Sequence, residues 1–187
     1  QKTKNLIWSE LLLKKLDLPQ NTFIEFGVET YREANTRFLL MHDNWSGLVI
    51  DGSKSNINDI VSQSIYWRYS LNAIQSFITA ENIDETITNN NMSGEIGILS
   101  VDIDGNDYWV LQSMNLSNIK VICCEYNHWL GANSSLAMKY DPNFNFVDNG
   151  IFGASLLAFT EMLKEKNFSL IAVDSSGTNA FFTNNKY

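Results

Sequence analysis

The chain has 187 residues and a formal net charge of −8, because 21 acidic residues outnumber 13 basic ones. Its content of 44% hydrophobic and 12% aromatic residues excludes a disordered chain and suits one domain with a single core. The acidic balance and the scattered basic residues argue against nucleic-acid binding, and no apolar run reaches the length of about 18 residues that a membrane span needs.

Apolar runs typical of buried strands recur along the chain, and segments with helical periodicity separate them. An N-terminal helix is predicted within residues 1–19, where apolar residues recur at helical spacing until Pro19 ends the pattern. Strands are then predicted at 23–28, 47–53, 75–82, 95–105, 120–127, 169–175 and 179–184. Helices are predicted at 33–42, 54–65, 107–114 and 153–168.

The alternation of strands and helices predicts a mainly parallel sheet that is covered on both faces, which makes a three-layer α/β domain. The tight link Ser176-Gly177-Thr178 indicates that the last two strands form an antiparallel hairpin. We therefore predict a single Rossmann-like domain over residues 1–187 with seven strands in the order 3-2-1-4-5-7-6. A final hairpin on such a sheet is the layout of class I methyltransferases.

The two cysteines, Cys123 and Cys124, are adjacent within a predicted strand. Neighbouring side chains of a strand point to opposite faces, so these thiols are not expected to form an intrachain disulfide. A chain without disulfides is typical of a reducing compartment, so we predict a cytoplasmic location.

Polar residues gather at the carboxyl ends of the predicted parallel strands, which is where open α/β sheets bind their ligands. They are Gly27 and Glu29 after the first strand, Asp51, Gly52 and Ser53 after the second, Glu81 and Asn82 after the third, Asp102, Asp104 and Asp107 after the fourth, and Glu125 and Asn127 after the fifth.

The first two of these groups have the chemistry of a nucleotide-type cofactor site. A carboxylate at Asp51 can accept both hydroxyls of a ribose, although an aspartate there could instead cap the following helix. Gly27 lets a cofactor approach the backbone, but the G-x-G-x-x-G pattern of dinucleotide sites is missing. Glu25 and Glu29 would repel a pyrophosphate and tolerate a cationic sulfonium, so the charge pattern favours S-adenosylmethionine over NAD.

The stretch VDIDGND packs three carboxylates behind a buried strand. Asp102 and Asp104 could hold Mg²⁺ or another divalent cation through hard oxygen ligands, with Glu125 completing the site. One of the two aspartates could also act as a general base for a hydroxyl, and Asn127 could bind that hydroxyl. The alternative is a turn rich in Asx residues with a structural role.

Residues 128–150 are polar and rich in glycine and asparagine, so we predict a long loop that forms a lid over the substrate. Trp129 in this loop is the tryptophan best placed to stack on a substrate. The alternative is that it only anchors the loop to the core or lies on the surface.

Several stretches together resemble the FkbM-like S-adenosylmethionine-dependent methyltransferases over about residues 20–184. The stretches are FIEFGVE, NWSGLVIDGS, FITAENI, SVDIDGNDYWVL, CCEYN and the tail that begins at FGASLLAF. The resemblance implies a class I methyltransferase fold, S-adenosylmethionine as cofactor and O-methylation, often of sugar hydroxyls in glycans or natural products.

The resemblance also implies roles for individual positions. Glu25 and Gly27 match the cofactor loop, and Asp51 matches the acid that binds the ribose. The pair Glu81-Asn82 falls where the adenine environment is made, and Asp102 falls where the methionine end meets the acceptor. The acids Asp102, Asp104 and Asp107 take the places of the family's D-x-E-G-x-E segment. The sequence departs from the family at Glu29, which replaces a glycine, and at Ser100-Val101, which replaces a lysine.

The predicted function is S-adenosylmethionine-dependent transfer of a methyl group to a hydroxyl of a sugar, a glycan or a related small molecule. Proximity and alignment would supply most of the catalysis, and Asp102 or Asp104 would remove or orient the hydroxyl proton. One alternative is a non-catalytic or redirected Rossmann-like module that binds a nucleotide or a sugar. Another is a metal-dependent hydrolase built on Asp102, Asp104, Glu125 and Asn127. The sequence leaves the oligomeric state open.

Overall fold

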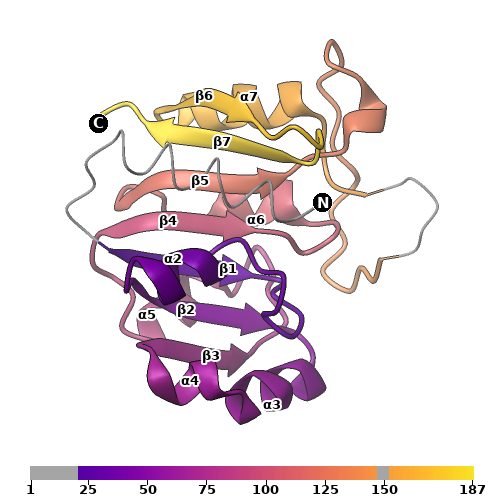
Figure 1. Ribbon diagram of the computed structural model, residues 1–187. Helices are drawn as coiled ribbons and strands as arrows, with labels where there is room; N and C mark the ends of the chain where they lie inside the picture. Colours follow the sequence, from indigo (N-terminus) through magenta and orange to yellow (C-terminus); the bar gives the residue numbers. More distant parts are fainter. Residues whose placement is uncertain (1–20, 147–151) are drawn as a thin grey trace.

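The structure is a computed structural model that describes residues 21–146 and 152–187 (Figure 1). Within these residues the strands form one sheet in the order β3-β2-β1-β4-β5-β7-β6. The strands are β1 (Thr22–Phe26), β2 (Ser46–Asp51), β3 (Leu71–Gln75), β4 (Ile96–Val101), β5 (Ile119–Glu125), β6 (Phe168–Val173) and β7 (Asn179–Asn184). The predicted N-terminal helix at 1–19 and the end of the predicted lid at 147–150 lie outside the described residues.

The strands β1 to β5 are parallel to one another, and β7 is antiparallel to both of its neighbours, β5 and β6. The predicted strand order and the predicted C-terminal hairpin are thus confirmed. The inner strands consist mainly of apolar residues, because both faces of a parallel sheet are covered. Ile24, Leu48, Leu99 and Ile122 are accordingly fully buried.

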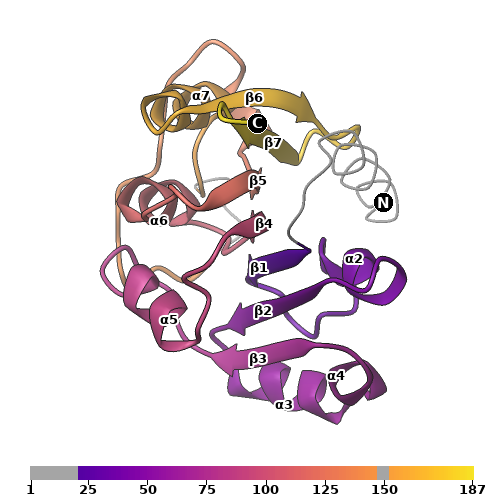
Figure 2. The same ribbon diagram turned by 90° about the vertical axis from the view of Figure 1, so that its left-hand side faces the viewer.

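Helices cover the sheet on both sides, which gives the predicted three layers (Figure 2). The helices are α2 (Arg37–His42), α3 (Lys54–Ser62), α4 (Ser64–Arg68), α5 (Ile83–Asn89), α6 (Asp107–Ser113) and α7 (Leu156–Glu165), and a 3-10 helix spans His128–Leu130. The apolar residues of α5, α6 and α7 belong to one buried cluster, and those of α2, α3 and α4 belong to a second cluster. Each cluster contains side chains from one face of the sheet.

The adjacent cysteines illustrate this division of the core. Cys123 belongs to one cluster and Cys124 to the other, so the two thiols point to opposite faces of β5. Both cysteines are buried and free, which confirms that they form no disulfide with each other.

The third predicted strand, 75–82, is wrong, because the strand runs from Leu71 to Gln75. Leu71 pairs with Gly47 of β2, and the chain leaves the sheet after Gln75. The following residues form a loop that Asn82 closes: its Oδ1 accepts a hydrogen bond from the Thr79 N–H, and its Nδ2 donates to the Phe77 carbonyl. The carboxyl end of this strand therefore lies several residues earlier than the sequence indicated.

The helices also differ from the prediction in places. The predicted helix 54–65 ends at Ser62, and a separate helix, α4, begins after Gln63, whose backbone is extended. The cap of α3 is Ser53, whose Oγ accepts from the Asn56 N–H at 3.5 Å. No helix within 21–146 or 152–187 is both long enough and apolar enough to cross a bilayer.

Candidate functional site

The carboxyl ends of β1 and β4 form the switch point of the sheet, because β1 lies between β2 on one side and β4 on the other. The chain leaves the two strands toward opposite edges, which opens a crevice between them. Two cavities lie at this crevice, a larger one of about 520 Å³ and a smaller one of about 260 Å³. Four residues line both cavities: Gly27, Glu29, Asp102 and Asp104.

Gly27 lines both cavities and lies against the main chain at the end of β4. Its φ is +68°, and a Cβ built on it would lie 1.6 Å from the carbonyl oxygen of Asp102. Only glycine fits there, because any side chain would collide with the main chain at the end of β4. The Gly27 N–H also donates to the Ile50 carbonyl at 3.0 Å, which extends the pairing of β1 with β2.

Glu25 anchors the loop that follows β1. Its carboxylate is buried and accepts hydrogen bonds from the Asn35 N–H at 2.8 Å, the Thr36 N–H at 3.0 Å and the Thr36 hydroxyl. Burial raises the pKa of Glu25, and the hydrogen bonds from Thr36, Asn35 and Ser100 oppose that rise. Glu25 lines the larger cavity and at the same time fixes the shape of that wall.

Asp51 lines the smaller cavity and also joins two loops. Its Oδ2 accepts from the Glu29 N–H at 2.8 Å, and its Oδ1 accepts from the Ser53 N–H at 2.8 Å and from Asn56 Nδ2 at 3.0 Å. A carboxylate has about four acceptor positions, so Oδ2 keeps room for one more donor. Gly52 lines the same cavity, whereas Ser53 caps α3 and lines neither cavity.

The remaining walls of the smaller cavity come from residues that the sequence did not single out. Ser76, Phe77 and Ile78 follow β3 on one side, and Phe144, Asn145 and Phe146 lie on the other. The Phe144 ring packs against Gly105, where an added Cβ would lie 2.4 Å from ring atoms. The correct end of β3 at Gln75 would have pointed to the first three of these residues.

The predicted pair Glu81-Asn82 lines neither cavity. Glu81 accepts a hydrogen bond of 2.6 Å from the Tyr140 hydroxyl, and Asn82 braces its own loop. Glu81 is thus tied to the segment that carries Phe144, and Asn82 holds the loop that carries Phe77, so each supports a wall of the smaller cavity.

The described part of the predicted lid, 128–146, is tied to the domain at several points. The carbonyl of Met138 accepts from Trp109 Nε1 at 2.8 Å, and that of Asp141 accepts from Asn106 Nδ2 at 2.7 Å. We call residues 138–146 the strap, because they cross the start of α6 and reach the loop after β3. The strap covers the smaller cavity.

Asn127, a predicted catalytic residue, lies at the base of this segment and lines neither cavity. Its Oδ1 accepts from the Trp129 N–H at 3.1 Å, and its Nδ2 donates to the Phe152 carbonyl at 3.0 Å. The side chain is buried, so it positions the two ends of the loop relative to β5.

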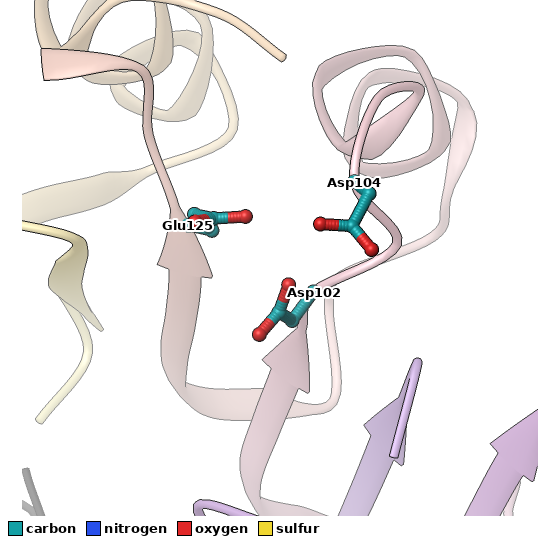
Figure 3. Close-up of side chains that lie close together, drawn as sticks. All are labelled: Asp102, Asp104 and Glu125. Carbon is teal, nitrogen blue, oxygen red and sulfur yellow. The ribbon is translucent and has the colours of Figure 1, made fainter. Parts of the chain in front are cut away.

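Asp102, Asp104 and Glu125 come together, as their places at two neighbouring strand ends indicated (Figure 3). One carboxylate oxygen from each lies within 4.8 Å of the others. Burial raises the pKa of Asp102 well above its ordinary value of 3.8, and the carboxylates of Glu125, Asp107 and Asp104 raise it further. Repulsion among these groups can be relieved in two ways, by a shared proton or by a cation.

The donor set of this trio fits a hard divalent cation. Three carboxylates are the oxygen ligands that Mg²⁺ prefers, and Mg²⁺ usually completes its shell with water or substrate. The third acid of the sequence motif, Asp107, does not join them. It is buried, and its oxygens accept from the Ile103 and Gly105 N–H groups at 2.9 Å, which holds the turn after β4.

The rest of the larger cavity is polar. Its far wall is the turn of the C-terminal hairpin, which contributes Ser176, Thr178 and Asn179. Among the described residues that line it, Arg32 is the one basic side chain, and Arg32 pairs with Asp59 at 3.1 Å. The larger cavity is therefore lined mainly by hydrogen-bond acceptors.

Comparison with known proteins gives matches at the level of structure alone. No protein-family model matches the sequence, and no curated protein matches it. The N-terminal domain of EvdMO1 with SAH bound matches with a TM-score of 0.62 and 8% identity, over 95% of this chain and 78% of that one. An S-adenosylmethionine-dependent methyltransferase from Clostridium acetobutylicum matches with a TM-score of 0.61 and 9% identity, over 98% and 92%.

An O-methyltransferase from Bacillus cereus in complex with SAH also matches, with a TM-score of 0.57 and 15% identity, over 96% of this chain and 79% of that one. At these identities the likeness establishes the fold alone. The seven-stranded sheet and its C-terminal hairpin are those of class I methyltransferases.

Proposed function

We propose that this chain is an S-adenosylmethionine-dependent methyltransferase of the FkbM-like kind, which methylates a hydroxyl of a sugar, a glycan or a related small molecule. The observation that carries the proposal is the meeting of two cavities at Gly27 and Asp102, at the switch point of a methyltransferase sheet. The smaller cavity combines the aromatic side chains of Phe77 and Phe144 with the carboxylate of Asp51, and the larger cavity is lined mainly by hydrogen-bond acceptors. That arrangement suits S-adenosylmethionine in the smaller cavity and the methyl-accepting substrate in the larger one.

The residues of the smaller cavity fit the adenosine part of the cofactor. The open position on Asp51 would accept a ribose hydroxyl, while Phe77 and Phe144 would lie against the adenine. The backbone at Gly27 would lie along the methionine part, which carries an ammonium group. Negative charge from Glu29 and Asp102 favours that cationic end.

Bound S-adenosylmethionine would supply an activated methyl group on a sulfonium. The chain's own contribution is to orient the acceptor hydroxyl in line with that group and to accept its proton. Asp102 is the better of the two candidate bases, because its raised pKa makes its carboxylate a stronger proton acceptor than an ordinary aspartate. Asp104 and Glu125 would hold the hydroxyl or share the proton.

A divalent cation is a second element of the proposal. Mg²⁺ held by Asp102, Asp104 and Glu125 would orient the acceptor oxygen and lower the pKa of its hydroxyl. The same trio is the observation that favours a metal-dependent hydrolase as the alternative function. Activity that requires Mg²⁺ and proceeds without S-adenosylmethionine would favour that alternative.

Titration calorimetry with S-adenosylmethionine and SAH, with and without Mg²⁺, tests the proposal. Wild-type protein should bind with a Kd in the micromolar range, and Asp51→Ala should weaken binding at least about tenfold, because the ribose loses a charged acceptor. Asp59→Ala is the matched control, since Asp59 lies on the neighbouring α3 and lines neither cavity. An absence of binding under every condition would refute the methyltransferase proposal.

A further inference from the structure

The larger cavity carries a strong excess of negative charge. Among its described lining residues Arg32 is the one basic side chain, and its guanidinium pairs with Asp59, which does not line the cavity. The acidic residues that line it are Glu25, Glu29, Glu33, Asp102, Asp104 and Glu125. The ammonium group of a bound cofactor, beside Glu29 and Asp102, would offset only part of this charge. Charge alone does not identify a ligand, so the neutral polar side chains of the cavity decide which group fits.

Asn179 is a neutral side chain of this cavity, and its orientation is fixed. The residue is 5% exposed, and its Nδ2 donates to Asp174 Oδ2 at 3.0 Å. Burial would raise the pKa of Asp174, but hydrogen bonds from Thr178 and Asn179 bring that pKa below its ordinary value, so the carboxylate only accepts. The amide must therefore keep its NH₂ group toward Asp174 and its Oδ1 toward the cavity that it lines.

Among the described residues, no donor bonds to Asn179 Oδ1. This oxygen is not sealed in the core, because the one fully buried side-chain atom without a partner in the described chain is the Thr183 hydroxyl oxygen. Asn35 lines the same cavity and also directs its NH₂ group into the protein, where it donates to Ser100 Oγ at 3.1 Å. Both amides thus use their donors inside the protein and leave their oxygens for a ligand.

This set of acceptors favours an ammonium group over a hydroxyl. A hydroxyl both donates and accepts, whereas an ammonium has three donors, no acceptor and a positive charge. Asn179 lies directly opposite Glu125 in the antiparallel pairing of β7 with β5, so their side chains share one face of the sheet. A group that donates to Asn179 Oδ1 therefore lies close to a carboxylate as well.

We propose that the methyl-accepting substrate is a hydroxylated primary amine, whose ammonium group is held by Asn179 Oδ1 and Glu125 in the larger cavity. The ammonium anchors the molecule, and a hydroxyl elsewhere in it is methylated. In that step the hydroxyl oxygen bonds to the methyl carbon as the carbon–sulfur bond breaks, and the hydroxyl proton passes to Asp102. This inference rests on the proposed methyltransferase function and specifies the charge of its substrate.

Matched ligands isolate the contribution of the ammonium group. Ethanolamine is compared with ethylene glycol, which is neutral, and with glycolate, which is anionic. Choline keeps the positive charge of ethanolamine but has no N–H donor. Glucosamine and glucose repeat the comparison on a larger molecule. Binding is measured by calorimetry and by NMR titration in the presence of EDTA, which keeps the acidic trio free of metal.

Ethanolamine and glucosamine should bind at least about tenfold more tightly than their neutral counterparts, and glycolate should bind most weakly. Choline should bind about 3- to 10-fold more weakly than ethanolamine, because it cannot donate to Asn179 Oδ1. Added salt should weaken the binding of the amines and leave that of the neutral ligands unchanged. Equal binding of amines and neutral counterparts, tighter binding of glycolate, or amine binding that requires Mg²⁺ would overturn the inference.

Two variants test the residues that hold the ammonium. Glu125→Gln should lower the affinity for ethanolamine at least about tenfold. Asn179→Ala should lower it about 3- to 10-fold and leave choline binding unchanged, because choline makes no hydrogen bond to lose. Glu85→Gln is the matched control, since Glu85 is exposed on α5 and lines neither cavity. Equal losses in Glu125→Gln and Glu85→Gln would contradict the assignment.

Titration of the same preparations with S-adenosylmethionine separates this inference from the proposed function. Amine binding in the presence of cofactor, followed by methylation on oxygen, supports both. Amine binding in a protein that binds no cofactor would uphold the ammonium site and refute the methyltransferase. Cofactor binding without any preference for amines would do the reverse. Competition between amine and cofactor would show that the acids hold the cofactor's own ammonium, and this result or methylation on nitrogen would overturn the inference.

Discussion

The two cavities that meet at Gly27 differ in the side chains that line them. Phe77 and Phe144 give the smaller cavity aromatic walls beside the carboxylate of Asp51, whose partners are neutral donors. The larger cavity has no aromatic side chain among its described lining residues and is lined by carboxylates and by the hydroxyls of Ser176 and Thr178. Aromatic packing contributes to the walls of the smaller cavity but not to those of the larger one, so substitutions should affect the two in different ways.

This difference shows how one edge of a sheet can bind two chemically different groups. Apolar walls favour a flat neutral group, whereas a cluster of acids favours positive charge and hydroxyl donors. The border between them, at Gly27 and Asp102, is where a positive centre would be stabilised best. The following predictions test whether the two cavities behave as separate sites with a shared border.

Gly27→Ala should have the largest effect and should damage both cavities at once. The added Cβ collides with the Asp102 carbonyl, and alanine resists a φ of +68°, so the free energy of unfolding should fall by about 3 kcal/mol or more. Urea denaturation measures the change. Gly94→Ala is the control, because nothing lies within 4 Å of a Cβ there, and it should change stability by less than about 0.5 kcal/mol. Similar losses in both variants would contradict the close approach.

Asp102→Asn should act mainly on the larger cavity. Loss of the proton acceptor should lower kcat about 100-fold or more, while the Kd of S-adenosylmethionine changes by less than about tenfold. Rates measured under saturating cofactor, together with calorimetry, separate the two effects. A loss confined to cofactor binding would show that Asp102 serves the cofactor and does not accept the proton.

The same variant should alter how stability depends on pH. Because burial raises the folded-state pKa of Asp102, its contribution to stability is complete below its ordinary pKa of 3.8 and is lost as the pH rises through the raised value. Asp102→Asn should therefore reduce the fall in stability with rising pH. Part of the fall in stability with rising pH should remain in this variant, because the pKa values of Glu25 and Asp107 are also raised. Glu165→Gln, which removes an exposed carboxylate at the end of α7, is the matched control.

Phe144→Ala should have the smallest effect and should act on the smaller cavity alone. The variant removes one aromatic wall, so the affinity for S-adenosylmethionine should fall about 3- to 10-fold with little change in kcat. Phe38→Ala is the matched control, because Phe38 is half-buried on α2 and lines neither cavity. Equal affinities in the two variants would show that the strap contributes nothing to cofactor binding.

The parts of this site that the sequence predicted are those that depend on local pattern. Parallel strands buried on both faces appear as apolar runs, and the polar residues after them must meet at one edge of the sheet. This rule alone predicts that Asp102, Asp104 and Glu125 lie together. It also places Gly27 and Asp51 beside the same crevice.

The features that were not predicted from the sequence are an exposed edge strand and contacts between segments that are far apart in the sequence. β3 lies at the edge of the sheet and contains Asn72 and Gln75, so it lacks the apolar run of an inner strand. Phe77 and Ile78 line the smaller cavity, and their apolar side chains made the loop after β3 look like the strand. Phe144 reaches that cavity from a segment distant in the sequence, and no local pattern reports such a contact.

The strap connects the smaller cavity to the rest of the domain. Its Phe144 and Phe146 line that cavity, while the carbonyl of Met138 accepts a hydrogen bond from Trp109 on α6. A ligand that contacts the strap must stabilise this attachment by as much as the attachment strengthens its binding, because linked free energies are reciprocal. A substitution that loosens the strap at α6 should therefore weaken binding in the smaller cavity without touching the ligand.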